Sequence, residues 1–447
     1  MNRLSARRQP LSKGETLLFA LLPLGILGFV VSGLWLRRGD ETPRIVFPTP
    51  AALPNPNGFD FYVAAARAIR PAKPSVDPVD GGRWVLTTNP KLAAQNYSLK
   101  RRLAHLSANR AGFALVQQGL HTPSRFNPVN GFSAFGSLRQ LAREKVIESN
   151  TFILQKRWNE ATQSSLDAIQ MGNDIARGGP LMARLMGTSV AALGRESLGT
   201  DQAVPERLNA AQAKSAARRL EAILTARPTY ADALKGGKWA SLAEFQAVVK
   251  NGNWRALATQ NNTETTWRER FATQFLSARE VNQRISDAFD RAAADVQKPF
   301  GAAPAPAPKL DPISAAFAPE IQSLRFSDGR EQVQLNVLLL RFALRAYRLE
   351  NGAFPDNLNL LVPKYLKKIP TDYFASGAPF RYRKSGRNYD LWSVGPDQID
   401  NGGVPIKSRD YGGPVPAPLK TNGANQSGRF PAMMNDSTGD YVAGKNR

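Results

Sequence analysis

The chain has 447 residues, of which 42% are hydrophobic and 21% charged, and this composition suits globular domains rather than wholesale disorder. It contains no cysteine and only two histidines, His105 and His121, which excludes disulfides, thiolate catalysis, zinc–thiolate sites and a metal site built from histidine alone. The net charge of +23 suits an anionic partner, such as an acidic envelope polymer or a lipid surface, or is simply a solubility feature. No nucleic-acid-binding motif surrounds the basic residues, so nucleic acid is not the expected partner.

A hydrophobic segment runs from Leu17 to Leu36 without a charged residue, and thirteen of its residues are Leu, Ile, Val or Phe. Twenty helical residues span about 30 Å, the hydrocarbon thickness of a bilayer. Trp35 and the following Arg37-Arg38 are typical of the membrane interface. The segment therefore predicts a transmembrane helix that contacts membrane lipid. The alternative is a cleaved signal peptide, for which Val31-Ser32-Gly33 would be a poor cleavage site.

The charges on the two sides of this helix give only a slight orientation signal, because Lys and Arg residues flank both ends. The positive-inside rule favours a cytoplasmic N-terminus, residues 1–16. We expect a single-pass protein of the cell membrane with an extracytoplasmic body.

Composition and hydrophobic periodicity divide the body. Residues 37–58 are rich in proline and asparagine and form a predicted linker. Residues 59–298 carry apolar side chains at helical spacing and predict a helical bundle. An Ala/Pro linker covers 299–326, and the tail at 412–447 has few large apolar residues and is expected to be disordered. The expected helices are Phe59–Ile69, Lys91–Leu120, Leu138–Lys156, Trp158–Gly172, Leu181–Leu198, Leu208–Ala226, Tyr230–Val249 and Glu264–Val296.

One part of this region resembles a tetratricopeptide-type hairpin. Small residues at Ala161 and Ala168 would let two helices approach closely. No second copy follows at a spacing of about 34 residues, which favours an ordinary helix pair over a repeat array.

Residues 327–411 predict a small α+β module. Ser327 or Asp328 is a candidate helix cap, with Glu331 completing a capping box, and the helix extends to Leu349 before Asn351-Gly352 stops it. Two apolar stripes predict a helix buried over more than half its girth, as when it crosses a sheet. The strands of the expected antiparallel hairpin are Phe380–Arg383 and Tyr389–Val394. The fold class is therefore mainly α, with a transmembrane helix, a helical bundle and then a long helix with a hairpin.

Four short sequences in this order resemble the soluble part of the major pseudopilin of bacterial type II secretion systems. They are Tyr347-Arg-Leu-Glu-Asn-Gly-Ala-Phe-Pro355, Ile369-Pro-Thr-Asp372, Phe380-Arg-Tyr-Arg383 and Tyr389-Asp-Leu-Trp-Ser-Val-Gly-Pro-Asp397. The resemblance covers about residues 330–411 and extends to the C-terminal ends of uncharacterised bacterial envelope proteins. It implies an extracytoplasmic location.

The resemblance also implies a calcium-binding loop, since the pseudopilin loop binds calcium. Asp397 matches the first acidic ligand of that loop, and Asp410 is the candidate for the distal one. Asp400 is close enough in the sequence to contribute, and calcium takes about six to eight oxygen ligands. The alternative is a plain Asx/Gly turn without a metal, because Lys407 and Arg409 bring positive charge into the loop.

The chain departs from the pseudopilins at its N-terminus. Gly14 is followed by Glu15-Thr16-Leu17, with no glutamate at the fifth place, and the hydrophobic helix lies about 300 residues before the module. This argues against assembly into a pseudopilus.

The chain carries no H-E-x-x-H and no G-x-S-x-G motif. For His105 and His121 we expect surface or capping roles. The sequence thus predicts no catalytic residue and no enzyme. It favours an envelope protein with a structural or interaction role. The alternatives are a type II secretion or pilus-like component, and a glycan-binding protein or hydrolase whose site is unrecognised.

Overall fold

A computed structural model describes residues 45–49, 51–70, 99–198, 204–252, 254–260, 266–303, 306, 308–406 and 437–443. The predicted transmembrane helix at 17–36 and the basic segment 1–16 lie outside these ranges. Within the described ranges, no helix combines the length and apolar character needed to cross a membrane.

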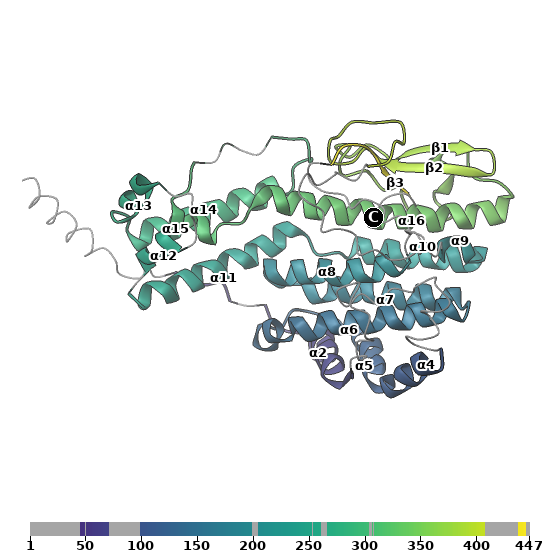
Figure 1. Cartoon of the computed structure of the whole chain (residues 1–447), viewed down its shortest axis with the longest axis horizontal. Helices are drawn as coiled ribbons and strands as arrows, with labels where there is room; N and C mark the ends of the chain where they lie inside the picture. Colours follow the sequence, from purple (N-terminus) through teal and green to yellow (C-terminus); the bar gives the residue numbers. More distant parts are fainter. Residues whose placement is uncertain are drawn as a thin grey trace, which may run out of the picture. The chain divides into compact units, whose positions relative to one another are not determined.

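The described residues are mostly helical and contain a small antiparallel sheet of three strands, so the predicted mainly α class with a small β element is confirmed (Figure 1). The helices of the N-terminal half are α2 (Gly58–Ala68), α4 (Leu99–Ala108), α5 (Arg110–Leu120), α6 (Pro128–Leu154), α7 (Trp158–Ala176), α8 (Leu181–Ser197), α9 (Val204–Arg207) and α10 (Ala210–Thr225). They are followed by α11 (Tyr230–Lys250), η2 (Trp254–Ala256), α12 (Leu257–Gln260), α13 (Trp267–Thr273), α14 (Ala278–Asp295), α15 (Pro312–Phe317), α16 (Ile321–Asn351) and η3 (Leu358–Leu361).

The chain forms two compact units. The smaller, unit 1, holds the described residues of 1–49, 238–291 and 306–319, and the larger, unit 2, holds those of 50–237, 292–305 and 320–447. Unit 2 thus combines most of the predicted helical domain with the C-terminal module.

The tightest helix contact in unit 2 is made by small residues of α7 and α8. A Cβ atom added at Gly187 would lie 2.2 Å from the carbonyl oxygen of Gly172, so these two backbones leave no room for a side chain. A Cβ atom added at Gly194 of α8 would lie 2.9 Å from the Cβ atom of Ala168, one of the two small residues noted in the sequence. The predicted helix pair therefore exists as α6 and α7, but the close approach at Ala168 is made by α8.

The helix α16 begins earlier than the sequence predicted. Glu320 is its N-cap and accepts hydrogen bonds from the backbone N–H groups of Gln322 and Ser323. The expected cap at Ser327 or Asp328 was therefore wrong, and Glu331 lies in the body of the helix. The C-terminal end is as predicted, because Gly352 adopts the left-handed conformation (φ 78°) that glycine accepts readily.

The hairpin forms as predicted from β1 (Arg381–Ser385) and β2 (Asn388–Ser393), with Arg381 opposite Trp392. A third strand, β3 (Tyr441–Val442), pairs with β2 and is buried. The expected disordered tail at 412–447 lies largely outside the described residues, but its residues 437–443 belong to the sheet region.

A single hydrophobic core joins α16 to both of its neighbours. Figure 1 shows α16 running between the hairpin and the helices α9 and α10, and it contacts α10, α9, β2 and η3. Both predicted apolar stripes are buried, so the prediction of a helix covered over more than half its girth is confirmed. The buried stripe residues are Leu335, Val337, Leu339, Leu340, Phe342, Leu344 and Ala346.

Candidate functional site

The predicted acidic loop lies beside the sheet, and its described carboxylates accept hydrogen bonds from the backbone. Asp397 accepts from the N–H groups of Ile399 and Gly439 at 3.2 and 2.9 Å. Asp440, which the sequence did not single out, accepts from the N–H groups of Asn401 and Gly403 at 3.1 and 2.7 Å. The segment around residue 440 therefore closes the loop. Asp410, the predicted distal ligand, lies outside the described residues.

The third carboxylate of the loop, Asp400, is held by side chains as well. It accepts the indole N–H of Trp392 at 3.0 Å and the guanidinium Nε of Arg381 at 2.9 Å. The hydrogen bond from Trp392, aided by those from Gly402 and Arg381, lowers the pKa of Asp400. Burial and the nearby charges of Asp400 and Asp397 raise the pKa of Asp440.

These contacts bear on the expected calcium ion. Every carboxylate oxygen of Asp397, Asp400 and Asp440 accepts a hydrogen bond, and Arg381 supplies a positive charge. Within the described ranges, no group of three or more acidic or histidine side chains is arranged to hold a metal ion. The described residues alone therefore do not fit a calcium cage.

The two histidines differ from each other. His121 lies at the C-terminal cap of α5, with Nδ1 2.7 Å from the carbonyl oxygen of Gln117, which agrees with a capping role. His105 is partly exposed, and its Nε2 lies 2.6 Å from a carboxylate oxygen of the fully buried Glu144. This pair joins α4 to α6, and no sequence motif marks it, since 39 residues separate the two partners.

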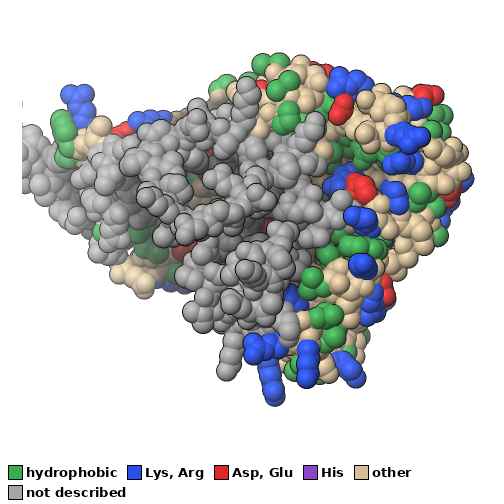
Figure 2. Space-filling view, turned by 45° about the vertical axis from the view of Figure 1, so that its right-hand side comes forward, with side chains coloured by type: hydrophobic (Ala, Val, Ile, Leu, Met, Phe, Trp, Pro, Cys, Tyr) green, Lys and Arg blue, Asp and Glu red, His purple; other side chains and the backbone are tan. Residues whose placement is uncertain are grey.

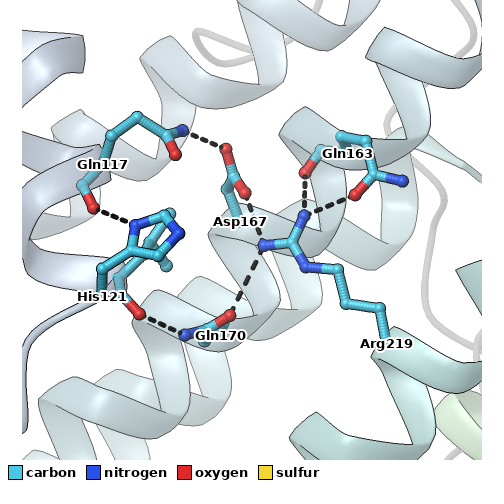
Figure 3. A pocket seen from close by; sticks show the side chains of 7 residues that line it. Gln117, His121, Gln163, Asp167, Gln170 and Arg219 are labelled. Carbon is cyan, nitrogen blue, oxygen red and sulfur yellow. Dashed lines mark hydrogen bonds and ion pairs between the residues drawn. The ribbon is translucent and has the colours of Figure 1, made fainter.

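An open groove of about 420 Å³ lies in the helical part of unit 2 (Figure 3). Six of its seven lining residues are polar, and they come from α7, α10 and the C-terminal end of α5. The lining residues are Gln117, Leu120, His121, Gln163, Asp167, Gln170 and Arg219. The amide, imidazole, carboxylate and guanidinium groups of this set offer hydrogen-bonding contacts for a polar ligand.

Asp167 and Arg219 of the groove form, with two further charged residues, a network that we call the Asp167 network: Lys145, Glu148, Asp167 and Arg219. Asp167 accepts from Arg219 at 2.6 Å and from Lys145 at 3.1 Å, and Lys145 also pairs with Glu148. Burial opposes ionisation of Asp167, but the charges of Lys145 and Arg219 outweigh it and lower its pKa. Figure 3 shows Arg219 bonded to Gln163 and Gln170 as well, so this guanidinium faces other groups of the groove.

A second network lies deeper, and we call it the Glu331 network: Arg184, Arg227, Asp328 and Glu331. Glu331 of α16 accepts from Arg184 of α8 at 2.8 Å and from Arg227 at 2.9 Å, and Arg227 also pairs with Asp328. Arg184 is fully buried and lies over the ring of Tyr230, 4.6 Å from its centroid. The network therefore fastens the N-terminal half of α16 to the helical part of the unit.

The ionisation of Glu331 depends on its partners. Burial raises the pKa of this carboxyl, but the charges of Arg227 and Arg184, with hydrogen bonds from Arg184 and Thr188, lower it to about 2. The sequence showed Glu331 only as a capping candidate. Its true partners are more than 100 residues away, and no local pattern reveals them.

Comparison of the chain with protein-family models, curated proteins and solved structures finds no match.

Proposed function

We propose that this chain is a membrane-anchored, extracytoplasmic protein of the bacterial envelope with a structural or interaction role, in which the pseudopilin-like module is built into a helical body. The uncharged segment at 17–36 supports the anchor, and the order of long helix, hairpin and acidic loop supports the module.

The observation that carries the structural role is the burial of α16 on two sides. Its apolar residues share one core with helices of the body, such as Ala213 and Leu220 of α10, and with hairpin residues such as Leu391. A helix enclosed in this way has little apolar surface left for packing against copies of itself. This favours an embedded module over the alternative of a type II secretion or pilus-like component.

Surface charge supports anionic envelope polymers or other envelope proteins as partners. On the face drawn in Figure 2, Lys and Arg side chains are dispersed over the coloured surface and are not gathered in one stripe. A dispersed positive surface attracts anionic polymers without selecting a sequence or a shape.

The polar groove favours a second candidate, an envelope glycan-binding protein. Three glutamines, His121 and the Asp167–Arg219 pair present hydrogen-bonding groups of both kinds, which sugar hydroxyls require. Isothermal titration of the full chain with soluble envelope glycan fragments tests this candidate. Binding heat with the wild type that disappears in a Gln170→Ala variant would support this candidate. No heat with the wild type would reject it.

The location is tested by adding protease to intact spheroplasts. We expect degradation of the body, because it would face the outside of the membrane. A cytoplasmic control protein must stay intact in the same sample. Full protection of the body would reject the proposed orientation.

Calcium binding by the C-terminal loop stays a prediction, because Asp410 lies outside the described residues. Isothermal titration of the full chain with calcium tests it, with Asp397→Asn and Asp410→Asn as variants. Heat that disappears in both variants would support a calcium loop. Absence of heat, together with an unchanged melting temperature, would show that the loop is a plain Asx/Gly turn without a metal.

A further inference from the structure

Unit 1 carries two exposed aromatic side chains on one short helix. Trp267 is 72% exposed and Phe271 is 50% exposed. Their spacing of four residues places them on the same side of α13. A capping box between Thr266 and Glu269 fixes the start of this helix, so its register does not depend on packing of the aromatic face.

The chemistry around these aromatics is that of a membrane interface. The guanidinium of Arg268, an exposed residue, lies 5.5 Å from the ring centroid of Trp267. Tryptophan is enriched at the headgroup level of bilayers because its ring is apolar and its N–H is polar. Arginine beside it can pair with lipid phosphates.

The position of unit 1 along the chain places it next to the hydrophobic segment. Residues 45–49 belong to this unit, and the ring of Phe47 packs edge-on against Trp239 of α11 at 6.0 Å. Ile45 follows Leu36, the last residue of the hydrophobic segment, by nine positions. Nine residues reach at most about 30 Å when fully extended, so an anchor at 17–36 would hold unit 1 close to the bilayer.

We propose that unit 1 docks on the bilayer surface through α13, with Trp267 and Phe271 in the headgroup region and Arg268 on the phosphates of anionic lipid. This inference rests on the proposed membrane anchor and adds a second contact to it. Docking at α13 would restrict how the body stands on the membrane, which a flexible linker alone would leave free.

The absence of cysteine allows a direct test with the full chain, since one introduced cysteine takes one label. Gln274→Cys, an exposed position at the C-cap of α13 that leaves Trp267 and Phe271 in place, receives an environment-sensitive fluorophore, and Val129→Cys with the same label is the matched control. Val129 is an exposed apolar residue of unit 2, 85% exposed. Both proteins are reconstituted into vesicles of phosphatidylcholine, with and without phosphatidylglycerol, and a headgroup-level nitroxide lipid serves as quencher.

We expect a blue shift and nitroxide quenching for the label at 274, stronger with phosphatidylglycerol, and neither change for the label at 129. In the Gln274→Cys background, Trp267→Ala should weaken the quenching, and Arg268→Glu should remove the dependence on phosphatidylglycerol. An unquenched label at 274 on protein that stays in the vesicles after a carbonate wash overturns the docking but not the anchor. Equal quenching at both positions also overturns it. Loss of the chain from the vesicles in the wash overturns the proposed anchor itself.

Discussion

In both the Glu331 network and the Asp167 network a carboxylate lies between two cations, but the two networks differ in their exposure to solvent. Arg184 and Glu331 are buried between α8 and α16, away from the groove. Arg219, by contrast, is partly exposed and lines the groove with its glutamine partners. A buried ion pair loses much of its stability when one partner is removed, whereas water can replace a partner at an open site. The Glu331 network therefore stabilises the fold as a buried unit, whereas in the Asp167 network Asp167 and Lys145 are buried and only the contacts of Arg219 can be replaced by water.

The largest effect is expected for Glu331→Ala. Removing this carboxylate leaves Arg184 and Arg227 buried with only Asp328 as an acidic partner, and such a loss costs about 3–5 kcal/mol. Urea unfolding followed by circular dichroism measures it. Glu160→Ala is the control, because Glu160 forms an exposed pair with Arg157 and should cost at most about 1 kcal/mol. Equal losses in the two variants would contradict the assignment of the Glu331 network.

The second prediction concerns the loss of folding stability at acidic pH. The pKa of Glu331 is about 2 in the folded protein and 4.5 in the unfolded chain, so its charge stabilises the fold above pH 4.5. This contribution, about 3 kcal/mol, is lost as the pH falls from 4.5 to 2, because the unfolded chain binds the proton first. The stability difference between the wild type and Glu331→Gln should therefore shrink over this range. A difference that stays constant from pH 6 to pH 2 would show that Glu331 is not ionised in the fold.

What the sequence could predict depended on the distance between interacting residues. The hairpin was found because its strands are joined by a few residues around Gly386, and the end of α16 was found because Gly352 is a local signal. The start of α16 was missed because Ser327-Asp328 resembles a cap as closely as Glu320 does. Both charge networks were missed because their partners lie on separate helices, for example Asp167 and Arg219, 52 residues apart.

The candidate calcium loop was also predicted only in part, because one of its carboxylates is distant in the sequence. Asp397 was singled out by the resemblance to the pseudopilin loop, and Asp400 because it lies three residues further along the same loop. Asp440 comes to this loop by pairing of β3 with β2, and nothing near residue 397 in the sequence points to it. Long-range strand pairing is decided by the whole fold, and a reading of local patterns does not reach it.

The interface of α7 and α8 separates the two networks, since Asp167 lies on α7 and Arg184 on α8. Gly187→Ala should destabilise the protein by about 1–3 kcal/mol, because the new methyl group would overlap the carbonyl of Gly172. Gly136→Ala is the matched control on α6, where a Cβ atom meets nothing within 4 Å, and it should stabilise by about 0.4–1 kcal/mol. Thermal melting of both variants measures the contrast. A neutral Gly187→Ala would mean that the two helices can separate without loss.

The smallest effect is expected for Arg219→Ala. Asp167 keeps Lys145 at 3.1 Å and Gln117 at 2.7 Å, and water can enter from the groove, so the loss should be about 1 kcal/mol. Arg227→Ala provides the direct comparison, because it removes one cation from Glu331 and should cost about 3–5 kcal/mol. Urea unfolding of the two variants side by side measures the difference. An equal loss of stability for Arg219→Ala and Arg227→Ala would show that Arg219 stabilises the fold as much as the buried network does. It would then remove the reason to regard the groove as free to bind a ligand.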